Sequence, residues 1–310
     1  MSIIVLFLGH GPIAPECLRA IIHDDDFHLF SIFTHPSSSA SQKEHRESMA
    51  EVAGECGLDV RLIEDVGMMR ELIEQSACDL MVSVGFLKII PADILRVPRL
   101  GAINIHGGLL PKYRGRAPIS WALLNGEKTI GITVHYMSEE VDSGDIILQH
   151  RINVSVQDTA ATLYEKMKRL SPGVLLEAMR MFRHGPPVGV PQDETLATKY
   201  GKLTPDVCEI SWDEPAEKVH DRVRALVRPY PGAYTYYGDK KYFVWKSMPV
   251  STELTDYLPG QVLEKSRRGV VVGTGEGAIF IEEVQEEGGD PSSPVWEVGK
   301  FLKNRSEYGS

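Results

Sequence analysis

The sequence predicts an α/β protein whose first part is a mostly parallel sheet and whose second part is a small open β-barrel. Nearly continuous apolar runs alternate with helical patterns in the first part, which is typical of a parallel sheet covered on both faces. After Pro205, short strand-like runs are separated by Gly and Asp turns, as in small barrels. The length of 310 residues fits two domains better than one.

The first part alternates strands and helices in the manner of a Rossmann-like fold. Strands are expected at Ile3–Gly9, His28–Thr34, Val60–Ile63, Asp79–Val84 and Ala102–Ile105, and as a pair at Ile130–Met137 and Asp145–Ile152. Helices are expected at Pro15–His23, Lys43–Cys56, Met68–Gln75, Pro91–Val97, Pro118–Asn125 and Ala160–Phe182.

The second part begins beyond His184–Pro191, where Gly and Pro gather. We therefore expect domains at 1–190 and 205–305. Strands are expected at Tyr230–Tyr237, Gly238–Trp245, Gly260–Glu264, Gly269–Val272 and Ala278–Glu283. Helix is expected only near Ala216–Val227 and at the C-terminal end.

Bulk properties indicate a soluble, cytoplasmic protein. No basic residue precedes the first apolar run, as a signal peptide would require, and no segment is long and apolar enough for a membrane span. The four cysteines have no paired spacing, which suits a reducing compartment. The formal net charge of −10 argues against a large nucleic-acid interface, because binding phosphates requires Lys and Arg.

A Gly-x-Gly motif, Gly9-His10-Gly11, follows the first strand and invites a dinucleotide-binding interpretation. The third small position is Ala14, and Pro12 lies inside the turn. The acidic residues that should follow the second strand precede it instead. A tight strand-to-helix turn is the better account.

The densest polar region runs from Asn104 to Asp145. Asn104 and His106 end an apolar strand, and side chains two apart on a strand share one face. Open α/β sheets bind ligands at the carboxyl ends of their strands. Asn104, His106 and Asp142 supply an amide donor, an imidazole and a carboxylate. This set suits acyl transfer without a covalent nucleophile, because the amide can stabilise an oxyanion while the other two groups move protons.

Two alternatives stand beside this interpretation. A purely structural role is common for an Asn-x-His pair, but two glycines and a cationic loop follow His106, which favours a polar or anionic ligand. The cations are Lys112, Arg114, Arg116 and, further on, Lys128. A metal site formed by His106, His135 and Asp142 is the other alternative. We expect no metal, because the closely spaced His or Cys cluster typical of zinc is missing from the sequence.

The region from Gly101 to Ile146 resembles the signature of the folate-dependent formyltransferases. The resemblance rests on Leu110-Pro-Lys-Tyr-Arg-Gly-Arg-Ala-Pro-Ile and Asp142-Ser-Gly-Asp-Ile. In the second domain, Lys202-Leu-Thr-Pro-Asp, Ile210-Ser-Trp, Val223-Arg-Ala-Leu-Val-Arg-Pro-Tyr-Pro-Gly-Ala-Tyr and Gly260-Gln-Val-Leu resemble the barrel of the two-domain members. Over residues 1–305 the likeness is greatest to nucleotide-sugar N-formyltransferases, such as those acting on UDP-4-amino-4-deoxy-L-arabinose.

The resemblance implies the formyltransferase fold, catalysis by Asn104, His106 and Asp142, and 10-formyltetrahydrofolate as cosubstrate. It places the folate along Lys88, Ile89 and Ile90, against Arg116, and along Ser138, Glu139, Glu140, Val141 and Asp142. The chain departs from the pattern at Gly108, where many members have Ser. We expect this difference to alter loop flexibility more than chemistry.

The resemblance also implies an amine acceptor, and we expect a nucleotide-linked amino sugar, as used in glycan or lipopolysaccharide biosynthesis. Residues 206–310 contain 13 Lys and Arg against 18 Asp and Glu, a net charge of −5, and the loop after Thr34 is nearly uncharged. A tRNA-binding domain should be basic. The phosphates of a nucleotide sugar need only a few local cations, for which the candidates are Lys112, Arg114, Lys202 and Arg228.

Other outcomes stay open from the sequence. Methionyl-tRNA and another small-molecule amine are the alternative acceptors. A folate-binding module without catalysis is disfavoured, because Asn104, His106 and Asp142 are all present. A hydrolase that releases formate would keep a similar set of residues, and it would consume the folate without any amine. The sequence also leaves a homo-oligomer open.

Overall fold

The computed structural model describes residues 2–36, 40–75 and 77–304, and the chain forms two compact units. The first comprises Met1–Pro118, Thr129–Asn153 and Tyr164–Tyr200, and the second comprises Ile119–Lys128, Val154–Leu163 and Gly201–Ser310. Two short segments from the first part of the sequence thus group with the second unit. That 1–190 and 205–305 fold as separate domains stays a prediction.

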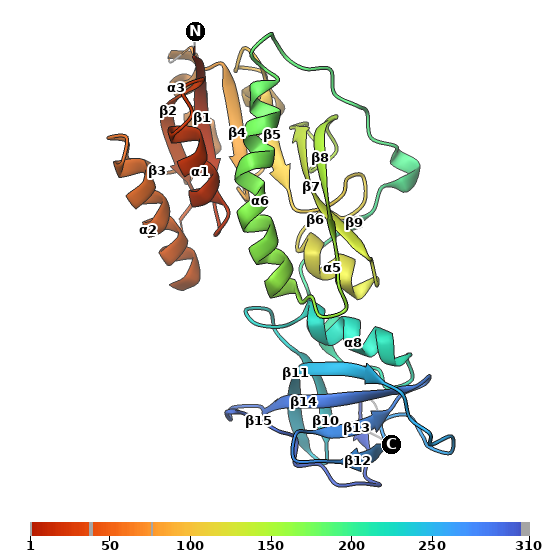
Figure 1. The fold of residues 1–310 in the computed structure, drawn as a ribbon. Coiled ribbons are helices and arrows are strands. Elements are labelled where there is room, and N and C mark those ends of the chain that lie inside the picture. The colour runs from red at the N-terminus through yellow and green to blue at the C-terminus, as the bar shows by residue number, and fades with distance from the viewer. Residues whose placement is uncertain (1, 37–39, 76, 305–310) are drawn as a thin grey trace. The chain divides into compact units, whose positions relative to one another are not determined.

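The first unit is built on a seven-stranded, mostly parallel sheet (Figure 1). Its order is β3 (Val60–Leu62), β2 (Phe27–Thr34), β1 (Ile3–Gly9), β4 (Leu80–Val84), β5 (Ala102–His106), β7 (Thr129–Tyr136) and β8 (Ile146–Asn153). The first five strands are parallel, whereas β7 runs antiparallel to β5 and β8 antiparallel to β7. Every residue of β4 is buried, as expected for a central strand covered on both faces. The predicted Rossmann-like class is confirmed.

Helices follow the strands as the sequence pattern predicts. They are α1 (Ala14–Ile22), α2 (Ala40–Gly54), α3 (Met69–Gln75), α4 (Ala92–Leu95), α5 (Pro118–Leu124) and α6 (Ala160–Arg180), with single 3₁₀ turns at Val66–Met68 and Glu194–Leu196. A short parallel pair joins β6 (Arg114–Gly115) to β9 (Lys199–Tyr200). Among the described residues, no helix is both long and apolar enough to cross a membrane.

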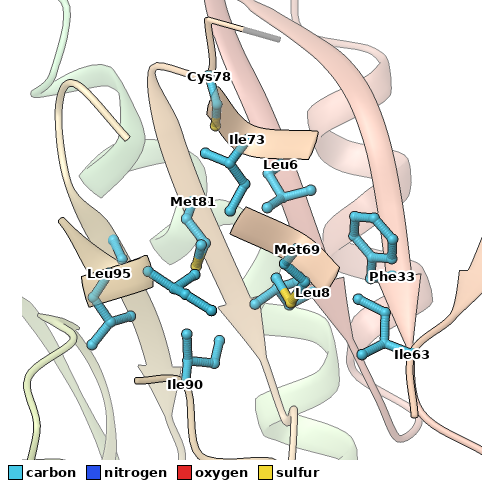
Figure 2. Packing of buried hydrophobic residues seen from close by; sticks show 12 residues of the cluster. Leu6, Leu8, Phe33, Ile63, Met69, Ile73, Cys78, Met81, Ile90 and Leu95 are labelled. Atoms are coloured by element: carbon cyan, nitrogen blue, oxygen red, sulfur yellow. The ribbon is translucent and has the colours of Figure 1, made fainter. Parts of the chain in front are cut away.

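One core of the first unit lies between the sheet and the short helices α3 and α4 (Figure 2). Leu6 and Leu8 of β1 and Met81 of β4 face Met69 of α3 and Leu95 of α4. Because strand side chains alternate, the residues between them, such as Phe7, belong to the opposite face. Burying both sets fixes the register of the sheet and hence the position of its carboxyl-terminal edge.

The Gly-x-Gly turn after β1 is explained by packing and backbone conformation. A Cβ at Gly9 would lie 2.6 Å from the Phe7 ring and 2.8 Å from the Met49 sulfur. Gly11 has φ +77°, which favours glycine. The tight turn therefore needs both glycines without any dinucleotide.

The second unit is an antiparallel sheet in the order β12 (Val262–Lys265), β13 (Val270–Gly273), β14 (Ala278–Glu286), β11 (Lys240–Val250), β10 (Ala233–Tyr237) and β16 (Leu302–Lys303). The strand β15 (Pro291–Ser292) pairs with β14, and two helices, α7 (Pro205–Cys208) and α8 (Ala216–Ala225), accompany the sheet. A bridge between Gln261 and Phe301, next to the two end strands, curls the sheet toward a barrel. The predicted open barrel is thus confirmed.

The helix predicted at the C-terminal end is wrong within the described residues, because Leu302–Lys303 is a strand instead. This segment pairs with Tyr236 and Tyr237 of β10. Pairing with the exposed edge of an existing sheet outweighs the local preference of a short polar segment.

Candidate active site

Three polar side chains meet where β5 and β7 lie side by side. The antiparallel register sets Asn104 opposite His135, and the Asn104 Nδ2 atom donates to His135 Nε2 at 3.2 Å. The His135 Nδ1–H donates to the Tyr136 carbonyl at 2.7 Å, which leaves Nε2 as an acceptor. His135 therefore fixes the orientation of the Asn104 amide.

The Asp142 carboxylate joins this group from the turn between β7 and β8. Its Oδ2 lies 3.5 Å from His106 Nδ1, and its Oδ1 lies 3.5 Å from both Asn104 Nδ2 and His135 Nε2. Asn104 and His106 thus share a face of β5, as the strand period predicts. The side chain of Asp142 is only 10% exposed, and the backbone N–H of Gly115 donates to its Oδ2 at 2.9 Å.

The environment of Asp142 keeps its carboxylate ionised. Burial acts to raise the pKa, but the neighbouring His106 ring and the Gly115 N–H act against it, and the pKa of Asp142 lies well below its usual range. Asp142 is therefore ionised in the resting enzyme at working pH.

His106 is buried with both ring nitrogens directed at oxygen atoms. Its Nε2–H donates to the Tyr113 carbonyl at 2.8 Å, while Nδ1 faces Asp142. The loop after His106 is held by Thr133, whose hydroxyl donates to the Gly108 carbonyl at 2.6 Å. A proton on either nitrogen thus has an acceptor, and the ring is fixed in its plane.

Gly108 lies close to the imidazole ring of His106. A Cβ at this position would lie 2.9 Å from His106 Nε2 and 3.3 Å from the Pro118 Cβ. Any side chain there would press on the ring in this conformation. Whether this glycine affects loop flexibility more than chemistry stays a prediction.

A cavity of about 120 Å³ opens beside Asn104 and Asp142. It is lined by Ser83, Phe86, Leu87, Lys88, Ile89, Ile90, Asn104, His135, Met137, Ser138, Glu139, Glu140, Val141 and Asp142. All predicted folate-binding residues except Arg116 are among them. Pockets that enclose a whole drug-sized ligand measure about 300–1,000 Å³, so this cavity suits one end of an extended molecule.

Two predicted cations lie elsewhere. Arg116 is exposed, in the loop after β6, and does not line the cavity. Arg114 was a candidate for binding acceptor phosphates, but it is buried and its guanidinium donates to both carboxylate oxygens of Glu194, at 2.9 and 2.7 Å. That expectation is wrong, because the guanidinium already has its anionic partner.

The sequence analysis missed two contributors. His135 was considered only as a metal ligand, since the register that sets it opposite Asn104 is not readable from the strand pattern. Gln192 was not considered, and it donates to the carbonyls of Asp142 and Gly144. Within the described ranges, no group of three or more His, Cys, Asp or Glu side chains is placed to hold a metal ion.

Comparison with known protein families identifies the family of this chain. The formyl transferase family model matches residues 1–179, and the model of the formyl transferase C-terminal domain matches residues 202–296. This chain belongs to the formyltransferase family. It is thus a formyl-transferring enzyme, and the family resemblance seen in the sequence is confirmed.

Relatives of this formyltransferase differ in their acceptors. The methionyl-tRNA formyltransferase of Alkaliphilus oremlandii (strain OhILAs) is 32% identical over 289 residues, which are 92% of each chain. The structure of WlaRD, a sugar 3N-formyl transferase with dTDP and 5-N-formyl-THF, has a TM-score of 0.69 at 17% identity and covers 91% of this chain and 98% of its own. An N-formyltransferase from Helicobacter canadensis, in complex with folinic acid and dTDP-3-aminofucose, has a TM-score of 0.65 at 18% identity, covering 91% and 99%. The two structural likenesses establish the fold.

Proposed function

We propose that this formyltransferase moves a formyl group from 10-formyltetrahydrofolate to a primary amine, with Asn104, His106 and Asp142 at the reacting centre. The observation that carries the proposal is the convergence of these side chains beside the cavity lined by Lys88–Ile90 and Ser138–Asp142. Two structures of the same fold bind formylated folates, which supports a folate donor.

In the proposed reaction the neutral amine attacks the formyl carbon, and an oxyanion forms on the formyl oxygen. The bond from that carbon to the folate N10 then breaks, and the proton lost by the amine is transferred to N10. Asp142 and His106 carry this proton, because they are the adjacent carboxylate and imidazole. No covalent enzyme intermediate is needed, because the amine is the nucleophile.

Asn104 is best placed to donate to the oxyanion. One of its amide hydrogens is committed to His135 at 3.2 Å, whereas the other faces Asp142 at 3.5 Å. The contact with Asp142 is too long to be a strong N–H···O bond. This amide hydrogen can therefore turn from Asp142 to the oxygen on which negative charge develops. Once His106 has taken up the amine proton, its positive charge adds to this stabilisation.

For the acceptor we propose the amine of a nucleotide-linked amino sugar. The net charge of −5 over residues 206–310 supports a small acceptor, because a tRNA-binding domain should be basic. The two sugar formyltransferase structures, each bound to a dTDP compound, point the same way. Methionyl-tRNA is the second candidate, favoured by the 32% identity to a methionyl-tRNA formyltransferase.

One assay separates these acceptors. The enzyme is incubated with 10-formyltetrahydrofolate and either a panel of nucleotide-linked amino sugars or charged initiator tRNA, and products are analysed by mass spectrometry. Replacement of one amine hydrogen by CHO on a sugar supports the proposal. Salt-sensitive formylation of the tRNA alone would refute the sugar assignment, and folate consumption without any amine would indicate a hydrolase.

A further inference from the structure

The backbone at Asp142 adopts a conformation that needs support from its surroundings. Its φ is +57°, in the left-handed region that residues with a side chain seldom occupy. Neighbouring Gly144 packs so closely that a Cβ there would lie 1.9 Å from the Tyr136 carbonyl oxygen. Such a turn persists only where other contacts hold it, and the direction of the Asp142 carboxylate depends on it.

Those contacts come from Gln192, fifty residues further along the chain. Its Nε2 donates to the Asp142 carbonyl at 2.8 Å and to the Gly144 carbonyl at 2.7 Å. One amide group therefore bridges both ends of the turn, and both of its hydrogens are used.

The oxygen of the Gln192 side-chain amide fixes the orientation of that amide. Gln192 Oε1 accepts from the Arg114 Nε at 3.1 Å and from its Nη2 at 2.8 Å. A guanidinium only donates and a carbonyl only accepts, so the amide has a single satisfied orientation. The next residue, Gly115, donates its backbone N–H to the Asp142 carboxylate. The pair Arg114 and Gly115 thus holds both the Asp142 carboxylate and Gln192, the residue that supports the turn at Asp142.

We propose that Gln192 is a positioning residue that sets the direction of the Asp142 carboxylate toward His106. It acts on the backbone of the turn, through the carbonyls of Asp142 and Gly144, rather than on the carboxylate itself. The inference rests on the proposed function for its catalytic consequence, but the placement of the turn can be observed independently.

The variant Gln192→Glu tests this by exchanging one NH₂ for oxygen. Its carboxylate keeps an ionic partner in Arg114, but it faces two carbonyls that it cannot donate to. We expect kcat to fall about tenfold to a hundredfold, since small displacements of reacting groups have effects of that size. KM for 10-formyltetrahydrofolate should stay within about threefold, because Gln192 itself does not line the cavity proposed for the donor. Asp193→Asn is the matched control, an isosteric change one residue along at an exposed position, and it should keep wild-type kcat.

The double variant Gln192→Glu/Asp142→Asn separates positioning from a general structural defect. If Gln192 acts through Asp142, adding Gln192→Glu to Asp142→Asn should lower kcat by less than about twofold. Full additivity of the two losses would overturn the inference, as would wild-type kcat in Gln192→Glu. If Asp142→Asn alone keeps its turnover, the catalytic role proposed for Asp142 fails instead. A crystal structure of Gln192→Glu then decides: a displaced 142–144 turn supports the positioning role, and an unmoved turn refutes it.

Discussion

At the scale of single residues, the site is a set of polar atoms whose partners leave little freedom. His135 orients the Asn104 amide, and the Tyr113 carbonyl and Asp142 hold the two nitrogens of His106. Groups held in this way need not reorganise as charge develops, which is the main source of electrostatic catalysis. Each member should therefore affect the rate of reaction more than substrate binding.

The first prediction concerns His106 and Asn104. Changing either to alanine should lower kcat by about a hundredfold or more, because proton transfer or oxyanion stabilisation is lost. The affinity for folate should change little, as measured by direct titration of the donor. His150→Ala, an exposed histidine on β8, is the control and should retain full turnover. Near-normal turnover of His106→Ala would contradict the assignment.

The second prediction follows from the lowered pKa of Asp142. A carboxylate whose folded pKa lies below its unfolded value of about 3.9 stabilises the native state fully above that value. This stabilisation is lost as the pH falls through the folded pKa. The Tm difference between wild type and Asp142→Asn should thus be constant from pH 7 to about pH 5 and narrow below about pH 4. A difference that narrows between pH 5 and 7 would show that Asp142 titrates in that range, against the geometry described.

At the scale of elements, the loop after β5 is as constrained as the strand before it. Thr133 of β7 accepts from the Leu110 backbone N–H and donates to the Gly108 carbonyl, so the loop cannot shift away from the imidazole. Gln149 of β8 donates to the Leu110 carbonyl at 2.7 Å and adds a second anchor. The three strands β5, β7 and β8 therefore determine the space beside His106.

The third prediction concerns the space beside the His106 ring. Gly108→Ala should displace the His106 ring, because the added Cβ would lie 2.9 Å from Nε2 with Pro118 behind it. We expect kcat to fall about tenfold or more, since the imidazole leaves its productive position. Gly173→Ala is the control, because a Cβ there has no atom within 4 Å and the residue lies in α6. Unchanged kcat in Gly108→Ala would mean that the loop after β5 can shift to accommodate the methyl group without displacing His106.

At the scale of the whole molecule, the two units do not divide at a single point in the sequence. The segment Val154–Leu163 groups with the second unit although the strands before it belong to the first. Arg224 of α8 explains why: its Nη1 donates to the Ser155 carbonyl at 2.9 Å and to the Asp158 carbonyl at 3.0 Å. Its Nε donates to Asp221 at 2.8 Å, and both side chains of that pair are buried.

The fourth prediction concerns this buried pair. Arg224→Met should lower the free energy of unfolding of the second unit by about 3–5 kcal/mol, because it leaves the Asp221 charge buried without its partner. Calorimetry would measure the loss. Lys240→Met, which removes an exposed ion pair with Glu286 on the same sheet, should leave the unfolding transition nearly unchanged. Equal effects of the two changes would show that the Arg224 contacts are not structural.

Local sequence patterns determined most of the fold and part of the site. The apolar runs of β1 to β5 and the Gly and Asp turns of the barrel predict the elements, because a strand buried on both faces shows as a continuous apolar run and a half-buried strand as an alternation. The alternation of side chains along a strand places Asn104 and His106 on one face at the end of β5. The cofactor segments came from likeness to relatives. All of their residues except Arg116 line the cavity, and the binding of a folate there stays a prediction.

Tertiary structure alone decided the partners of those residues. His135 meets Asn104 because of a strand register, and Gln192 meets the Asp142 turn across fifty residues of chain. Arg114 is neutralised by Glu194 rather than left for a phosphate, and the last strand pairs with β10 where a helix was expected. A local pattern reports which groups prefer burial, whereas hydrogen bonds and ion pairs depend on distances that only the packed chain sets.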